Sequence, residues 1–354
     1  MQLANAFFVL TIACSARQVR AHVAAWHKGM YCFNGTQPGF VNQNANEAVQ
    51  PLFNLTRDEW WFHHKNNCDQ FPPAPGDFLE LPAGGTFTVE HAVNRAYTSL
   101  SYNGAGANEF LDGQPLPKLA ENVELPCISS PNIHTQNESM AAGTAFAISY
   151  QSDITKVTEE NLVVFTVLYN TPWRRIATYS VPASMPACPA EGCICAWGWV
   201  PNGCGEPNMY MLPYRCRVTG ATSTIPLAPA KPAGWCEDDF SKCTPGAKQM
   251  IYWNQFEGNN IEVSGLDLSG HVRSPAYNVK LGFPNGAQND IFLTGAAASS
   301  AASSAPRPTS TTPTSTPTSS SRPQDNSASR AGQLSHPALH YATLCFIFIT
   351  LRLL

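Results

Sequence analysis

The chain has 354 residues, and the 44% that are hydrophobic are enough to form a packed core. It carries 21 basic and 25 acidic residues, and loss of Arg17, Arg20, Arg330 and Arg352 during the processing described below would leave 17 basic residues and a net charge of −8. A mature chain this acidic has no basic footprint for nucleic acid, which excludes nucleic-acid-binding proteins.

Residues 1–21 are predicted to be a secretory signal peptide. The apolar stretch AFFVLTIACSA is followed by Val19-Arg20-Ala21, which has the A-x-A-like pattern of a cleavage site. Cleavage after Ala21 makes His22 the first residue of the mature protein. Its α-amine and ring Nδ1 can then bind one metal ion together, and both are good donors for copper. A second histidine would complete a three-nitrogen, T-shaped site, whereas without one His22 is an accidental first residue.

Residues 22–294 are predicted to form a single all-β domain. Amphipathic helical patterns are scarce, and short segments with strand character alternate with clusters of Pro, Gly and Asn, which is typical of a β-sandwich. We therefore expect two sheets with long decorated loops, such as those at 103–130 and 220–248, which cysteines tie down. The expected strands are Phe78–Leu81, Thr86–Val89, Thr144–Ser149, Leu162–Leu168, Ile176–Val181, Ile194–Val200 and Arg215–Val218.

The cysteine count agrees with secretion. Of the 12 cysteines, Cys14 would leave with the signal peptide and Cys345 with the C-terminal tail. An even number in a secreted domain is typical of a disulfide framework, and we expect five bridges with a pairing that the sequence does not give. The alternative is a zinc site at positions 188, 193, 195 and 204, which irregular spacing and an oxidising compartment disfavour. The ten remaining residues are Cys32, Cys68, Cys127, Cys188, Cys193, Cys195, Cys204, Cys216, Cys236 and Cys243.

Three sequons for N-glycosylation lie within the predicted domain. They are Asn34-Gly-Thr, Asn54-Leu-Thr and Asn137-Glu-Ser. In a secreted chain this tripeptide is an acceptor for an N-linked glycan and lies at the surface. Asn34, Asn54 and Asn137 are therefore the candidate glycosylation sites.

Several histidines could be the second ligand of a metal at His22. His27 follows so closely that a strand there would point the two rings to opposite faces. His63 and His64 lie in the aromatic segment EWWFHHKNNC, which we expect to be surface-facing or packed in a loop, and His91 follows a predicted strand and is expected to be half-buried. His134 lies in PNIHTQNESMAAGTAFAISY, where a loop enters a strand of small residues that leave room for copper and oxygen. We favour His134 over His91 because rigid elements carry precise sites.

The segment Pro207-Asn208-Met209-Tyr210-Met211 suggests further groups for the same site. If it is a strand, Asn208 and Tyr210 project from one face. The tyrosine hydroxyl could then cap the metal, and the amide of Asn208 could hydrogen-bond bound oxygen. The alternative is that Tyr210 is a core aromatic residue and Asn208 a turn residue, and spacing alone favours that alternative.

The C-terminal part has the composition of a stalk followed by an anchor signal. Residues 295–326 are rich in Ser, Thr and Pro, as in O-glycosylated stalks. Residues 327–354 contain a polar spacer and the apolar tail YATLCFIFITLRLL, which together with the preceding small residues match a GPI-attachment signal. Asn326 is the expected anchor site, with Ser327 and Ser329 as alternatives. We expect the protein on the outer face of the cell membrane through this anchor, or else extracellular; the alternatives for the tail are a marginal membrane helix and a disordered end.

Eight segments spread over the predicted domain carry a resemblance to a known family: HVAAWHKGMYCFN, EWWFH, PGDFLELPAGG, AFAISYQSDI, CPAEGCICAWGWVPN, YMLPYRCRVTGATS, GAKQMIYW and GAQNDIF. The chain resembles the lytic polysaccharide monooxygenases, and among them the fungal fourteenth auxiliary-activity family, which is described as acting on xylan associated with cellulose. The resemblance implies an immunoglobulin-like β-sandwich with one copper ion in a histidine brace. His22 matches the first brace residue, His134 the second, and Tyr210, six residues before Cys216, the axial tyrosine.

The resemblance also implies the chemistry. Copper cycles between Cu(II) and Cu(I) with an external electron donor and O2 or hydrogen peroxide, and a sugar carbon, C1 or C4, is oxidised so that the glycosidic bond breaks. No carboxylate pair is needed, unlike glycoside hydrolysis. The expected substrate, xylan on cellulose, would lie on a flat face around His22, with Trp26 or Tyr31 as candidate sugar-stacking groups, although core packing explains either residue equally well. We expect a monomer.

Two departures from the family pattern keep other functions open. Asn208 stands where many relatives have a glutamine, and the anchor signal indicates a cell-surface protein rather than a freely secreted one. The first alternative is a cell-surface copper-binding protein that uses the same brace without cleaving polysaccharide. The second is a non-catalytic carbohydrate-binding module whose histidines are incidental.

Overall fold

The computed structural model describes residues 22–115, 118–119, 129–130, 133–135, 137–202, 207–266, 268, 270 and 272–293. These residues belong to one compact unit, Met1–Ala305. The predicted signal peptide, stalk and anchor segment, including Asn326, lie outside the described residues, as do Cys127, Cys204 and His271. Among the described residues, no helix is long and apolar enough to cross a membrane.

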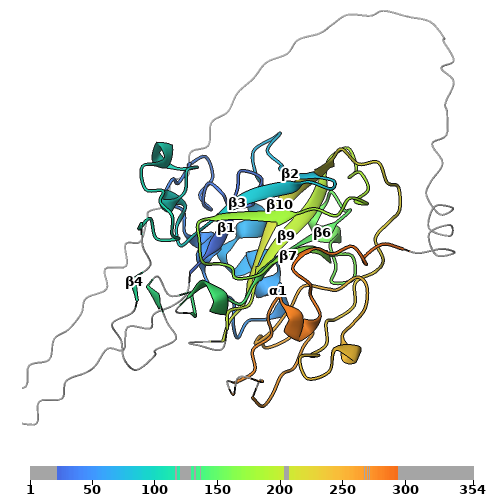
Figure 1. The fold of residues 1–354 in the computed structure, drawn as a ribbon. Coiled ribbons are helices and arrows are strands. Elements are labelled where there is room, and N and C mark those ends of the chain that lie inside the picture. The colour runs from blue at the N-terminus through green and yellow to red at the C-terminus, as the bar shows by residue number, and fades with distance from the viewer. Residues whose placement is uncertain are drawn as a thin grey trace, which may run out of the picture. The chain divides into compact units, whose positions relative to one another are not determined.

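Two sheets of mostly antiparallel strands form the centre of the domain, so the all-β prediction is confirmed (Figure 1). One sheet has three strands and the other six, and a separate two-stranded pair lies in the long loop before residue 133. In spatial order the smaller sheet is β1 (Ala24–Trp26), β3 (Thr86–Ala92) and β8 (Ile176–Ser180); the larger is β11 (Gly286–Ala287), β7 (Val163–Leu168), β6 (Thr144–Ser149), β9 (Cys193–Trp199), β10 (Tyr210–Thr219) and β2 (Leu79–Pro82); the pair is β4 (Lys118–Leu119) and β5 (Ser129–Ser130).

Aromatic side chains fill the space between the two sheets. Phe87 of the smaller sheet meets Phe146 of the larger one with ring centroids 5.0 Å apart, and it stacks on Tyr179 at 5.4 Å. Phe146 in turn contacts Tyr214 at 5.4 Å. Buried aromatic pairs of this kind add stability beyond that expected from their buried area alone. The layer between the two sheets is therefore the main core of the sandwich.

The other face of the larger sheet is also covered. Ala145 and Ala147 of β6 belong to a second core cluster, together with Met209, Met250 and Tyr277 from the loops. Strands buried on both faces have continuous apolar sequences instead of alternating ones. This explains the runs VVFTVL in β7 and CICAWGW in β9, whereas β8, with one face exposed, alternates between exposed and buried residues.

Helices contribute little to the fold. The one α-helix among the described residues, α1 (Arg57–Trp60), starts with a capping box in which the Glu59 carboxylate accepts from the Thr56 backbone N at 2.9 Å and from its hydroxyl at 3.0 Å. The remaining helical turns are short 3-10 helices. They are η1 (Glu47–Val49), η2 (Trp61–Asn66), η3 (Cys68–Gln70), η4 (Arg95–Tyr97), η5 (Tyr102–Gly104), η6 (Glu138–Met140), η7 (Ile154–Lys156), η8 (Phe240–Lys242) and η9 (Val279–Leu281).

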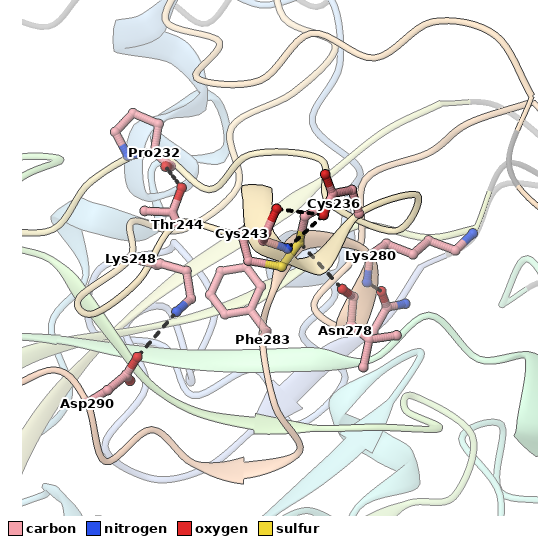
Figure 2. Close-up of a disulfide and its surroundings, with 12 residues drawn as sticks. Pro232, Cys236, Cys243, Thr244, Lys248, Asn278, Lys280, Phe283 and Asp290 are labelled. Atoms are coloured by element: carbon pink, nitrogen blue, oxygen red, sulfur yellow. Dashed lines mark hydrogen bonds and ion pairs between the residues drawn. A yellow bond between two sulfur atoms is a disulfide. The ribbon is translucent and has the colours of Figure 1, made fainter.

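Four disulfides lie within the described residues. One joins β9 to β10, one joins a loop to β9, and two join residues outside the strands. The four are Cys32–Cys68, Cys188–Cys193, Cys195–Cys216 and Cys236–Cys243, the last of which lies beside η9 (Figure 2). Three of the cysteines weighed as zinc ligands are therefore disulfide-bonded, which rules out that zinc site. Cys127 and Cys204 lie outside the described residues, so the expected fifth bridge remains a prediction.

Candidate metal centre

Three strand ends of the larger sheet meet beside two of the candidate residues, His134 and Tyr210. Trp199 at the end of β9 pairs with Tyr210 at the start of β10 and with Thr144 at the start of β6. The Trp199 ring stacks on the Tyr210 ring at 4.8 Å and stands edge-on to the His134 ring at 6.1 Å. The sheet register puts Tyr210 beside Trp199, and a loop brings His134 to the same tryptophan; both residues are 2% exposed.

His134 lies in a loop rather than on a strand. We expected the strand of small residues to hold it, but β6 begins only at Thr144. The His134 backbone has a left-handed φ of 56°, a conformation that histidine adopts more readily than most residues and that is enriched at functional sites. The turn that follows is capped by the Asn137 side chain, which accepts from the Met140 backbone N at 3.1 Å, and its Glu138 carboxylate accepts from Arg174 Nε at 3.2 Å. A loop anchored in this way can hold a buried imidazole in one orientation.

His22 lies two residues before β1 and is half-buried. The next residue, Val23, is fully buried in the same core cluster as Trp199 and Tyr210. β1 is held on both sides, because Ala24 pairs with Ala92 of β3 and the Ala25 carbonyl accepts a hydrogen bond from the Tyr214 hydroxyl of β10. The first residue after the predicted cleavage site is therefore fixed by the core and does not begin a loose tail.

Asn208 lies just before β10 and is 2% exposed. Met209 bridges to Leu52, with backbone hydrogen bonds of 3.0 Å in both directions, so the extended chain begins before the strand itself. Met209 packs in the second core cluster, on the other face of the larger sheet, and Tyr210 packs in the main core between the sheets. This alternation is that of a strand, and continuing it by one residue puts Asn208 on the Tyr210 side.

The other histidines that the structure describes in this domain are packed in the core, hydrogen-bonded or exposed, away from any candidate metal ligand set. His91 is fully buried within β3, where its Nε2 is 3.3 Å from the Tyr179 hydroxyl and burial lowers its pKa to about 3. His63 is also buried, and its Nε2 donates to the Glu47 carbonyl at 3.1 Å, whereas His64 is exposed beside Asp69. His27 Nδ1 accepts from the Gly29 backbone N at 3.0 Å. The expectation of a half-buried His91 was wrong, because β3 extends to Ala92 and takes His91 into the core.

The candidate donors are of a kind that copper accepts. Within the described part of the chain, no cluster of three or more His, Cys, Asp or Glu side chains could hold a metal ion. His22, His134 and Tyr210 offer imidazole nitrogens and a phenol. Imidazole suits copper in both oxidation states, and the amine of a mature His22 would add a third nitrogen.

The predicted sugar-stacking residues lie in the core. Trp26 is fully buried and donates from Nε1 to the Ala92 carbonyl at 3.0 Å, and Tyr31 is only 6% exposed. Neither can stack on a polysaccharide. The structure shows a surface aromatic that was not predicted from the sequence, the half-buried Trp253, whose backbone N contacts Met209 Sδ at 3.3 Å. Only the fold brings Trp253 next to the segment that carries Asn208.

The loop that carries Trp253 is locked in place. The side chain of Gln255 accepts from the Leu55 backbone N at 3.1 Å and donates to the carbonyls of Leu52 and Trp253 at 2.9 and 3.0 Å. The Asn254 amide donates to the Pro207 carbonyl at 2.7 Å. Residues 252–260 therefore present Trp253 from a rigid loop, a common way for a protein to hold a binding residue.

Comparisons with known proteins point to one family for most of the chain. A family model described as lytic polysaccharide monooxygenase AA14 matches residues 4–344. An AA14 family lytic polysaccharide monooxygenase B from Pycnoporus cinnabarinus is 39% identical over 299 residues, which cover 81% of this chain and 74% of the relative. Proteins of the same name from Trametes coccinea and Talaromyces rugulosus are 38% and 36% identical, with 81% and 77% of this chain covered and 66% and 93% of the relatives.

Proposed function

Because this chain belongs to the AA14 family of lytic polysaccharide monooxygenases, we propose that it cleaves xylan associated with cellulose by means of a copper ion bound to His22 and His134. Family membership supports an oxidoreductase that cleaves polysaccharide oxidatively. The finer proposal rests on one observation, the contact of the Trp199 ring with both His134 and Tyr210.

Each residue of the site has a proposed task. His22, once it is the N-terminal residue, binds copper through its amine and ring, and His134 adds the third nitrogen. Tyr210 offers its hydroxyl as a further ligand, and the amide of Asn208 donates a hydrogen bond to the oxygen co-substrate. When bound, copper supplies the redox chemistry that lets O2 or hydrogen peroxide oxidise a sugar C–H bond at C1 or C4, with electrons from an external donor. Trp199 excludes water from the faces of His134 and Tyr210 that it covers.

The test begins with the mature protein, whose first residue is identified by mass spectrometry. Copper titration followed by electron paramagnetic resonance should show one tight type-2 site. With copper and ascorbate, the protein should release oxidised oligosaccharides from xylan-coated cellulose. Tight copper binding without oxidised products from any of several polysaccharides would favour the cell-surface copper-binding function, and absence of the copper signal would overturn both.

Trp253 is proposed to contact the polysaccharide beside this site. Replacement of Trp253 by Ala should weaken retention on xylan-coated cellulose several-fold and leave copper binding unchanged, since the ring would stack on sugar and not touch the metal. The matched control is Ile225→Ala, which removes an apolar side chain that is 43% exposed, from the loop near Ser223 that pairs with Pro186. Equal retention of the two variants would contradict the role of Trp253.

The stalk and anchor expected from the sequence are also part of the proposal. A GPI anchor on Asn326 would hold the domain outside the cell, with residues 295–326 as a glycosylated stalk. Phosphatidylinositol-specific phospholipase C should then release the protein from intact cells. Continued retention after this treatment, with the tail still present by mass spectrometry, would contradict the anchor.

A further inference from the structure

A surface hollow of about 440 Å³ lies between η1 and η2, beside the sequon Asn54-Leu55-Thr56. The residues that line it include Asn54 itself and Phe53, together with Glu47, Gln50, Lys65 and Asn66. The size falls within the range of small-ligand sites. An aromatic residue together with amide, ammonium and carboxylate residues suits a sugar, which has an apolar face and a rim of hydroxyl and acetamide groups.

The walls of this hollow are preformed. His63 of η2 donates from Nε2 to the Glu47 carbonyl of η1 at 3.1 Å, so the two helical turns are joined. On the other side the Asn54 backbone N donates to the Asn254 carbonyl at 2.9 Å. Because the surrounding backbone is held at both ends, a ligand would find the hollow already formed and would not have to order it.

Asn54 is placed to carry that ligand covalently. It is exposed, and its backbone has a left-handed φ of 52°. Thr56, which completes the sequon, is also the N-cap residue of α1. By contrast Asn137, another sequon asparagine, uses its carboxamide oxygen to accept from Met140 N at 3.1 Å and Ser139 Oγ at 2.8 Å and does not line this hollow.

We propose that Asn54 carries an N-linked glycan whose first N-acetylglucosamine lies in this hollow, with its apolar face on Phe53 and its acetamide near Gln50 and Asn66. The attachment forms a bond between Asn54 Nδ2 and C1 of the sugar. The C1–O bond of a lipid-linked oligosaccharyl diphosphate breaks, the diphosphate leaves with the electron pair, and the amide proton passes to a base. The four disulfides indicate the oxidising secretory route in which this transfer takes place.

A docked sugar stabilises the fold, whereas a glycan that only projects into solvent has little effect. We therefore expect the first sugar to provide all of the stabilisation and the outer sugars to provide none. The inference does not depend on the proposed copper chemistry, because neither Asn54 nor Phe53 belongs to the candidate metal centre.

The test uses the full chain secreted from a glycosylating host, with site occupancy read by peptide mass spectrometry. The melting temperature should be unchanged after an endoglycosidase trims the glycan to a single N-acetylglucosamine, but about 3 °C lower in Asn54→Asp. Aspartate is chosen because it tolerates the left-handed φ about as well as asparagine. The matched control, Asn137→Asp, should leave the melting temperature unchanged.

A second background separates docking from any effect of the new charge. In a Phe53→Ala chain the hollow loses its aromatic wall, so adding Asn54→Asp should lower the melting temperature no further. An unmodified Asn54, or an equal drop on Asn54→Asp with and without Phe53, would overturn the proposal.

Discussion

Two almost fully buried histidines, His134 and His91, differ in the way that the chain holds them. His134 stands in a loop with a left-handed backbone and meets the edge of Trp199. His91 is inside a strand, with its ring 5.6 Å from Trp197 and its Nε2 near the Tyr179 hydroxyl. A ring enclosed by a strand and two aromatic side chains is a packing residue, whereas a ring held by an anchored loop can serve as a ligand.

This contrast gives the first prediction. His134→Ala should abolish tight copper binding, measured by isothermal titration, because it removes one of three nitrogens. His91→Ala should keep copper binding and instead lower the free energy of unfolding by about 2–4 kcal/mol through the cavity it leaves. The reverse pattern would mean that His91 is the ligand.

The buried histidines also predict how stability depends on pH. Burial lowers the pKa of His63 to about 4 and that of His91 to about 3, whereas in the unfolded chain both titrate near 6.5. The unfolded state therefore binds protons first, so their contribution is complete above pH 6.5 and is lost as the pH falls toward 4 and 3. At pH 4.5 each histidine should therefore lower the free energy of unfolding by about 2.5 kcal/mol relative to pH 8.

Urea unfolding at a series of pH values checks this. Carboxylates also titrate in the lower part of the range, so the comparison is with His63→Gln, whose amide can still donate to the Glu47 carbonyl. In that variant the loss of stability between pH 8 and pH 4.5 should be smaller by about 2.5 kcal/mol. The same loss in both proteins would show that His63 is protonated in the folded state.

Among the elements, η9 and the neighbouring disulfide depend on a glycine. Gly282 ends η9 with a left-handed φ of 67°, and a Cβ there would lie 2.8 Å from Cys243 Cβ and 3.0 Å from its Sγ. Figure 2 shows the Cys236–Cys243 disulfide beside η9. The Cys236 backbone N donates to the Lys280 carbonyl of η9 at 2.8 Å. The close approach of loop and helix therefore requires a residue without a side chain.

Substitution of two glycines separates strain from collision. Gly286 also has a positive φ, of 89°, but a Cβ added there would meet nothing within 4 Å. Gly286→Ala should cost about 1 kcal/mol of backbone strain, and Gly282→Ala at least about 2 kcal/mol because the clash with the disulfide is added. Chemical denaturation measures both, and equal costs would mean that the disulfide moves aside freely.

Strand positions could be predicted where one face is exposed or a short apolar run is bounded by turns. Thr144–Ser149 is confirmed residue for residue as β6, and β8 ends one residue before the expected Val181. β10 was predicted as Arg215–Val218, with a strand at Pro207–Met211 left open, and it starts at Tyr210. Its first half, YMLPY, is buried on both faces and contains a proline, so it lacks the alternation that indicates a strand.

The candidate centre was less open to prediction than the fold. Sequence reasoning and family resemblance named His134 and Tyr210, and the structure brings both to Trp199, which no motif singled out. Trp26 and Tyr31 were considered as surface residues because their segment lies near His22, but pairing of β1 with β3 buries Trp26. Trp253 could not be found from the sequence, since only the contact with Met209 places it.

At the scale of the whole molecule, the proposed centre joins residues that are far apart in the chain. His22, His134 and Tyr210 come from the start, the middle and the later part of the domain, and each is tied to the aromatic core by its neighbours. One of the three nitrogens is available only after the signal peptide is removed. Folding and copper binding are therefore expected to be separable, because β1 can form whether or not His22 carries a preceding residue.

The last prediction uses that separation. A chain secreted with one alanine added before His22 should unfold at the same temperature as the mature protein, because Val23–Trp26 can still pair with β3. Its copper affinity should fall by about 100-fold or more, since losing a partner of a ligand already costs about 10–100-fold and this change removes the donor amine itself. Differential scanning calorimetry and copper titration on the same sample check both results. If the extended chain bound copper as tightly as the mature one, the amine of His22 would not be a ligand and the proposed brace would be wrong.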